Sequence, residues 1–204
     1  MIVVIDYSIG NLSAVANMFK RLGVPCEITS DIEKIRRAEK LVLAGTGAFD
    51  ACMQGLRKTG LIPLLEERVL HGKTPLLGIC VGAQMLGHGS EEGLEKGLGW
   101  IDMKVKRFPS IGNLRIPHMG WCKVKQSKLS HTLLLNLDID ARYYFVHSYY
   151  MEVANPKNIV LTAHYGLDFA AAVCEENIIG IQSHPEKSHR FGKQFLEWFA
   201  RHYQ

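Results

Sequence analysis

Cys80 is the residue of this 204-residue chain best suited to nucleophilic chemistry, because it stands between two glycines in the segment 78–82, GICVG. An apolar run precedes it at 75–79, and a helix-like pattern follows. This is the form of a nucleophile on a sharp strand-to-helix turn, where a Cβ on either flanking residue would clash. The alternative is a buried apolar cysteine, the common fate of a free thiol.

A second motif, HPE at 184–186, supplies the base that a thiol nucleophile requires. Pro185 disfavours helical geometry at His184, and in an extended segment positions i and i+2 face the same side. We therefore expect His184 to face Cys80 while Glu186 fixes the ring tautomer from the other side. A lone histidine is more often structural, but a cysteine elbow in the same chain favours catalysis.

The turn at Cys80 also predicts how charge is stabilised there. A helix whose amino end points at the sulfur favours the thiolate over the thiol. The backbone N–H of Val81 lies in the first helical turn and is predicted to help hold an oxyanion.

The elements that must position these residues alternate between strands and helices in the first half. Strands are predicted at 2–6, 26–29, 41–45 and 75–79. Helices are predicted at 11–23, at 31–40 and, as one element, around 61–70. Asn11 is the expected N-cap of the first helix and Gly23 its stop signal. This alternation predicts a parallel sheet covered on both faces.

The second half changes character at residue 100. Short runs rich in β-branched and aromatic residues predict antiparallel hairpins added to the parallel core, and 187–203 predicts a final helix. The expected fold is α/β: an open, mostly parallel sheet flanked by helices, flavodoxin-like, with added hairpins in the second half. One domain is expected, spanning residues 1–204.

Composition excludes several classes of function. The net charge is +4 with no basic stripe between aromatics, so no nucleic-acid partner is expected. No apolar run approaches the ~18 residues of a membrane span, and the start has no basic region typical of a signal peptide. Five widely spaced cysteines without a C-x-x-C pair predict reduced thiols in the cytoplasm and no structural zinc. No metal and no cofactor is expected.

Together, GICVGAQML and SHPEKS resemble the class I, or triad, glutamine amidotransferases. Within that family, several further segments are similar to glutaminase subunits of imidazole glycerol phosphate synthase, which acts in histidine biosynthesis. They are DYSIGNLSAV (6–15), AGTGAF (44–49), EKGLGWI (95–101), IPHMGW (116–121) and YYFVHSY (143–149).

The resemblance implies that L-glutamine is hydrolysed to glutamate and ammonia. It implies that Cys80 forms a thioester, that His184 transfers the protons and that Glu186 orients His184. Oxyanion donors would be backbone groups of Val81, Thr46 and Gly47. The implied glutamine-binding residues are Gly45, Gly47, Gln84, Ser148 and Tyr149.

The resemblance also implies a partner, a (β/α)8-barrel cyclase that receives the ammonia within a heterodimer. The residues that match the partner-facing side are Pro117, Met119, Trp121, Tyr144 and Lys187. Taken from composition alone, these would be ordinary packing residues.

This sequence departs from the family pattern at Ala44, Thr46, Cys122 and Ser183, where proline, valine, asparagine and phenylalanine are expected. These departures put in doubt the usual coupling between a ligand at the partner's site and the glutaminase activity. Three other readings stay open. One is a side branch that supplies ammonia for an amidino sugar of a surface glycan. Another is a thiol hydrolase on a different α/β scaffold, and the third is a non-catalytic regulatory subunit.

Overall fold

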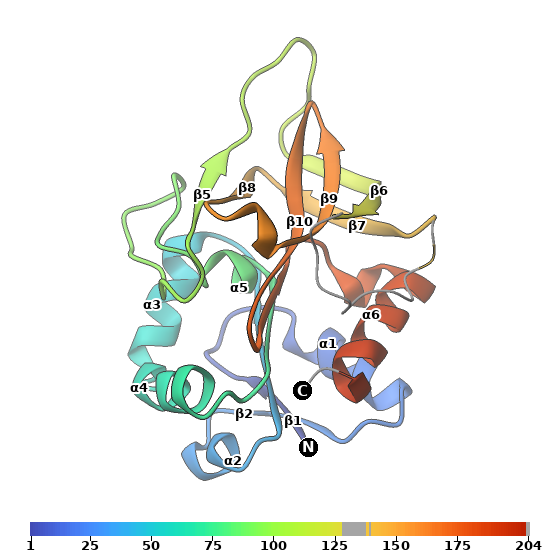
Figure 1. Ribbon diagram of the computed structural model, residues 1–204. Coiled ribbons are helices and arrows are strands. Elements are labelled where there is room, and N and C mark those ends of the chain that lie inside the picture. The colour runs from blue at the N-terminus through green and yellow to red at the C-terminus, as the bar shows by residue number, and fades with distance from the viewer. Residues whose placement is uncertain (128–137, 139, 203–204) are drawn as a thin grey trace.

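The structure is a computed structural model that describes residues 1–127, 138 and 140–202 (Figure 1). Four parallel strands from the first half of the chain lie in the order β2-β1-β3-β4. Their bounds are β1 (Ile2–Ile5), β2 (Cys26–Thr29), β3 (Lys40–Gly45) and β4 (Leu76–Cys80). Every residue of β1 and β4 is buried, as expected for parallel strands covered on both faces.

Helices cover both faces of this sheet (Figure 1). On one face, α1 (Leu12–Arg21) packs against the C-terminal α6 (His189–His202). The opposite face carries α3 (Phe49–Lys58), α4 (Ile62–Glu66) and α5 (Val81–Gln84), while the short α2 (Ile32–Arg36) joins β2 to β3. The expected α/β architecture is confirmed.

The second half extends the sheet with antiparallel strands. The order continues from β4 through β11 (Ile178–Ile181), β10 (Leu167–Glu175), β9 (Ile159–Tyr165), β6 (His118–Gln126) and β7 (Arg142–His147). β5 (Met103–Arg107) pairs with β8 (Tyr149–Val153), which touches β10, and a 3-10 turn, η3 (Pro156–Asn158), precedes β9. Because β11 lies parallel to β4, the segment that follows β11 begins beside Cys80.

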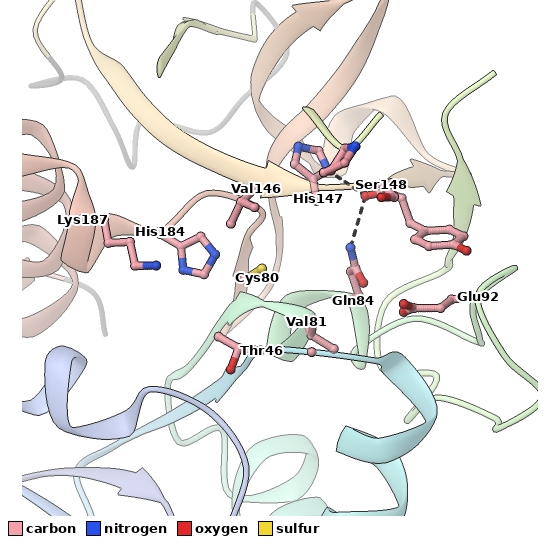
Figure 2. Close-up of a pocket in the computed structure, with 13 residues that line it drawn as sticks. Thr46, Cys80, Val81, Gln84, Glu92, Val146, His147, Ser148, His184 and Lys187 are labelled. Carbon is pink, nitrogen blue, oxygen red and sulfur yellow. Dashed lines mark hydrogen bonds between the residues drawn. The ribbon is translucent and has the colours of Figure 1, made fainter. Parts of the chain in front are cut away.

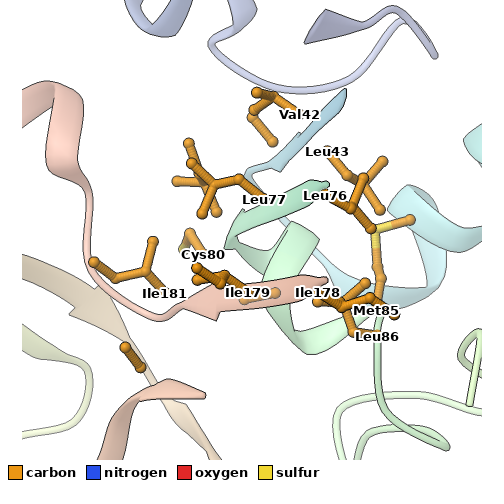
Figure 3. Close-up of a cluster of buried hydrophobic side chains, with 14 of the residues drawn as sticks. Val42, Leu43, Leu76, Leu77, Cys80, Met85, Leu86, Ile178, Ile179 and Ile181 are labelled. Carbon is orange, nitrogen blue, oxygen red and sulfur yellow. The ribbon is translucent and has the colours of Figure 1, made fainter. Parts of the chain in front are cut away.

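The core beneath Cys80 comes from three neighbouring strands, β3, β4 and β11, and from the turn after α5 (Figure 3). Its labelled members are at most 4% exposed: Val42, Leu43, Leu76, Leu77, Cys80, Met85, Leu86, Ile178, Ile179 and Ile181. Full burial of one aliphatic side chain stabilises a fold by ~1.5–3 kcal/mol. The turn that carries Cys80 therefore rests on a closely packed base.

Some predicted element details are wrong. The single helix expected around 61–70 corresponds to α4, which continues as a π-helical turn, η1 (Glu67–His71). A separate helix, α3, precedes it, and Gly60, with a φ of 68°, lies between the two. The segment 31–40 is helical only over α2, because β3 already begins at Lys40. Asn11 occupies the N-cap position, but its side chain makes no capping hydrogen bond. Gly23 does follow the end of α1 with a φ of 70°.

Candidate active site

Cys80 stands at the carboxyl end of β4, on a sharp turn into α5. Its φ of 54° and ψ of −115° form a backbone conformation that residues with side chains rarely adopt. A Cβ on Gly78 would come within 2.8 Å of the Ala83 Cα, and one on Gly82 within 1.9 Å of the Leu43 carbonyl oxygen. The turn and the clash that excludes side chains at 78 and 82 are as predicted.

The helix that follows Cys80 is shorter than the sequence pattern indicates. α5 is a single turn, and the chain bends away at Gly87 to pass close to β5, where a Cβ would lie 2.7 Å from the Met103 carbonyl oxygen. The predicted helix-dipole effect on the sulfur is therefore limited to one turn. The Val81 N–H still lies in that turn, where a helix offers it no acceptor of its own.

His184 contacts Glu186 as predicted, but the backbone conformation that brings them together differs from the predicted one. The backbone at His184 is extended, with φ −101° and ψ 90°, but Pro185–Lys187 forms a 3-10 turn, η4, and not an extended segment. The turn brings the Glu186 carboxylate back to the ring, and Oε1 lies 2.8 Å from Nδ1. The two side chains are only 3% and 2% exposed.

The Ser188 hydroxyl ties this turn to strand β7. It donates to the His184 carbonyl oxygen over 2.6 Å and accepts from the Tyr144 N–H over 2.9 Å. The His184 N–H in turn donates to the Tyr144 carbonyl oxygen. The main chain at His184 is therefore fixed from both sides.

The electrostatics of the site follow from these contacts. The His184 ring points toward the Cys80 sulfur (Figure 2) and hydrogen bonds with both Cys80 and Glu186. Burial lowers the pKa of His184, but the interactions with Cys80 and Glu186 outweigh it and raise the pKa to about 10. The ring is thus cationic at neutral pH and lies beside the Cys80 sulfur.

The segment Ala44–Gly47 lies against the elbow, where an oxyanion donor is expected. Gly45 is the register partner of Cys80 in the β3–β4 ladder, and a Cβ there would come 2.7 Å from the Gly82 nitrogen. Gly47 has a φ of 96°, which a side chain would strain.

Two buried side chains hold the carbonyl groups of this segment. The Tyr7 hydroxyl donates to the Ala44 oxygen over 2.7 Å, and the Cys52 thiol donates to the Thr46 oxygen over 3.6 Å. Burial raises the pKa of Tyr7 far above its ordinary value, so the hydroxyl keeps its proton. The backbone of the segment is therefore anchored from the side of the protein interior.

A cavity of about 340 Å³ opens above Cys80 (Figure 2). Ten of the residues predicted from sequence line it: Thr46, Gly47, Cys80, Val81, Gln84, Pro117, Ser148, Tyr149, His184 and Lys187. Gly45 does not line the cavity and lies at the end of β3, opposite Cys80 in the ladder. Glu186 lies behind His184, and its second oxygen, Oε2, is buried with no hydrogen-bond partner among the described residues.

Gln84 lies in the cavity wall, and its amide nitrogen already donates two hydrogen bonds within the protein. Nε2 donates to the Tyr149 carbonyl oxygen over 3.2 Å and to Gln182 Oε1 over 3.0 Å. Gln84 is 3% exposed. If it contacts a ligand, it therefore does so with its amide oxygen, as a hydrogen-bond acceptor.

Sequence reasoning missed three residues that line the cavity, Glu92, Val146 and His147. Glu92 lies at the end of the cavity remote from His184 (Figure 2), and one carboxylate oxygen accepts from the Phe49 N–H over 2.9 Å. The only sequence feature near Glu92 is a group of acidic residues at 91–95. Such a group usually marks a solvent-exposed loop and not a binding site. His147 lies inside YYFVHSY, a segment whose histidine was given no role.

Three of the residues expected to face a partner form a continuous surface with His189. The Trp121 ring, in a side chain 47% exposed, stacks on His189 with centroids 5.3 Å apart and meets the Tyr144 ring edge-on at 6.1 Å. Lys187 Nζ lies 6.0 Å from the Tyr144 ring centroid. Met119, on the same strand as Trp121, is 65% exposed.

All five cysteines are free. Over the ranges that the structure describes, no three His, Cys, Asp or Glu side chains are grouped so as to hold a metal ion. No helix in those ranges is long and apolar enough to cross a membrane.

Comparison with known proteins assigns the chain to one family. Residues 3–202 match the profile described as "Glutamine amidotransferase class-I". The chain therefore belongs to the class I glutamine amidotransferases, and the resemblance drawn from its motifs is confirmed.

Relatives narrow the family further. The chain is 50% identical over 200 residues to "Imidazole glycerol phosphate synthase subunit HisH 2" of Pseudomonas aeruginosa, with 98% of each chain covered. It is 46% identical to the protein of the same name from Methanococcus maripaludis, covering 98% of this chain and 99% of the relative. The corresponding HisH subunit of Bdellovibrio bacteriovorus is 43% identical, with the same coverage.

Solved structures share the fold at low identity. A crystal structure of a glutamine amidotransferase superposes with a TM-score of 0.73 at 18% identity, covering 97% of this chain and 98% of the other. A glutamine amidotransferase from Thermotoga maritima gives 0.62 at 19% identity, covering 96% of this chain and 80% of the other.

Proposed function

We propose that this chain is the glutaminase subunit of an imidazole glycerol phosphate synthase, and that it hydrolyses L-glutamine to L-glutamate and ammonia. One observation carries the proposal: a thiol on a strained elbow, an imidazole and a buried carboxylate hydrogen bond in series beside one cavity. Family membership and relatives at 43–50% identity over nearly the whole chain support it.

In the proposed reaction, the Cys80 thiolate attacks the side-chain amide carbon of glutamine. The negative charge that develops on the amide oxygen is met by N–H groups of Val81 and of Thr46 or Gly47. His184 gives a proton to the nitrogen as the C–N bond breaks, so that ammonia leaves and a γ-glutamyl thioester remains. His184 then takes a proton from water, hydroxide attacks the thioester, and glutamate and the thiolate are released.

The remaining cavity residues suit the amino-acid end of glutamine. The Glu92 carboxylate, at the end remote from His184, is placed to accept hydrogen bonds from the α-ammonium group. The Gln84 amide oxygen is a further acceptor. Gly47, Ser148 and Tyr149 line the same cavity.

Ammonia released into water at neutral pH would be mostly protonated and no longer nucleophilic, which favours direct transfer. We propose that a (β/α)8-barrel cyclase docks over the surface formed by Met119, Trp121, Tyr144 and Lys187, with Pro117 at the cavity edge. Large exposed apolar and aromatic side chains are typical of interface cores. The free thiols agree with a cytoplasmic complex.

A glutaminase assay tests the proposal. The purified chain should release glutamate slowly, and addition of a cyclase-type partner should accelerate the release because stabilisation of the oxyanion requires a fully preorganised site. Equal rates with and without the partner would contradict the coupling. A glutamine-like alkylating agent should label Cys80, and labelling of another residue would contradict the assignment of the nucleophile.

A further inference from the structure

A line of buried polar side chains runs behind the cavity wall, from strand β6 to the Cys80 sulfur. Its members are at most 7% exposed: His118, His147, Gln84 and Gln182. Burial of polar groups is costly unless each finds a hydrogen-bond partner. A satisfied line of four such residues is therefore a specific arrangement and not a by-product of packing.

The contacts along this line are continuous. His118 Nδ1 lies 3.1 Å from His147 Nε2, and His147 Nδ1 lies 2.7 Å from the Tyr149 carbonyl oxygen. The same carbonyl accepts from Gln84, which also donates to Gln182, and Gln182 Nε2 lies 4.0 Å from the sulfur. Figure 2 shows His147 and Gln84 converging on that oxygen from two sides.

These distances fix the tautomers of both histidines. A carbonyl oxygen only accepts, so His147 carries its proton on Nδ1. In the neutral ring Nε2 is then an acceptor, and His118 must donate to it from its own Nδ1. Burial lowers the pKa of both rings, to about 4 for His118 and about 3 for His147, so both are neutral at physiological pH.

Aromatic rings hold His118 in this orientation. Its ring stacks on Tyr165 with centroids 4.0 Å apart and on Phe145 at 5.2 Å, with interplanar angles of 19° in both cases. The next residue along β6, Met119, points out to the surface. His118 therefore presents one N–H to His147 from a rigid position.

We propose that His118 and His147 are positioning residues of the glutamine site. Together they hold the Tyr149 carbonyl, and with it the Ser148–Tyr149 wall and the Gln84 amide, in the geometry that binds the amino-acid end of glutamine. Neither histidine transfers a proton in the reaction. The inference rests on the proposed glutaminase function.

Three variants separate positioning from packing. His118→Phe keeps an aromatic ring between Tyr165 and Phe145 but removes the donor to His147, whereas His118→Asn keeps an amide N–H near the position of Nδ1. His71→Phe makes the same change at an exposed histidine before β4, at the opposite end of the strand from Cys80.

The readouts are KM and kcat for glutamine with the partner present. We expect His118→Phe to raise KM about tenfold, the effect of one buried hydrogen bond, with kcat changed less than threefold. His118→Asn should return KM to within about threefold of wild type, and His71→Phe should leave both constants unchanged. An unchanged KM in His118→Phe, or equal losses in the Phe and Asn variants, would overturn the proposal.

A spectroscopic measurement is independent of activity. Imidazole ¹⁵N chemical shifts of the wild-type chain should show His147 protonated on Nδ1 alone, and protonation on Nε2 would overturn the proposal. A wild-type chain that does not hydrolyse glutamine would contradict the proposed function, while these shifts would still decide whether the hydrogen-bonded line exists.

Discussion

Replacing Glu186 with glutamine tests the electrostatic part of the site. The glutamine side chain keeps an oxygen that can accept from His184 Nδ1, so the orientation of the ring is retained. What is lost is the negative charge, which lies 2.8 Å from the ring in a buried setting. The variant therefore separates orientation from charge.

The size of the effect follows from the pKa of His184. A rise from the ordinary value of about 6.5 to about 10 corresponds to about 5 kcal/mol in favour of the charged ring. Cys80 and Glu186 both contribute to this rise. An equal division assigns about half of this free energy to Glu186, or roughly a 60-fold change in an equilibrium constant.

We expect Glu186→Gln to lower kcat/KM about 60-fold, and His184→Ala to lower it about a thousandfold or more, because the latter removes proton transfer itself. The assay is glutamate release under saturating and limiting glutamine from pH 6 to 10. Glu186→Asp, which keeps the charge, serves as the matched control. A loss in Glu186→Gln as large as that in His184→Ala would refute the division between charge and orientation.

The same substitution has a signature in stability. A histidine with a raised pKa in the folded state contributes stability that is complete below the unfolded pKa of about 6.5 and disappears as the pH rises to about 10. In Glu186→Gln the folded pKa falls, so this loss should be complete at lower pH. Urea unfolding across that range measures it, and identical curves for the two proteins would refute the reasoning.

Three further outcomes are expected. Cys80→Ala should abolish glutamine-dependent turnover but leave partner binding and ammonia-dependent synthesis intact; glutaminase activity near the wild-type level would refute the assignment. Trp121→Ala should weaken partner affinity about 10- to 100-fold by calorimetry, as expected for an aromatic anchor, with Leu94→Ala, exposed elsewhere, as the control; equal affinities would remove Trp121 from the interface. Tyr7→Phe, which loses only the hydroxyl that holds Ala44, should lower kcat several-fold with little change in KM, and an unchanged kcat would show that this hydrogen bond does not position the oxyanion segment.

The sequence predicted the parts of the fold that local patterns determine. Buried runs such as 2–6 and 75–79 correspond to β1 and β4 because parallel strands covered on both faces are apolar throughout. The turn at Cys80 was predictable because its flanking glycines have a steric cause that acts within a few residues. Helix ends were less predictable because they depend on neighbouring elements. The end of α2 depends on where β3 begins, and the end of α5 on the close approach of the following chain, at Gly87, to β5.

Parts of the site that depend on distant contacts could not be predicted from the pattern. His118 and His147 are 29 residues apart and meet only because β6 and β7 pair in a register that places them opposite each other. Glu92 belongs to a loop without periodicity, and its place is set by the Phe49 N–H of another element. Glu186 was correctly paired with His184, but the 3-10 turn that joins them was not foreseen.

The structure shows how the oxyanion segment is restrained without the proline and valine that the family pattern has at Ala44 and Thr46. Proline would restrict φ in the oxyanion segment, and its absence predicts a looser backbone. In this chain the segment is restrained at its carbonyl groups instead, by the Tyr7 hydroxyl and the Cys52 thiol. A hydrogen bond to a carbonyl fixes the plane of the whole peptide, including the N–H of the next residue. The Cys52 contact at Thr46 thus orients the Gly47 N–H, one of the groups expected to meet the oxyanion, and does so without proline.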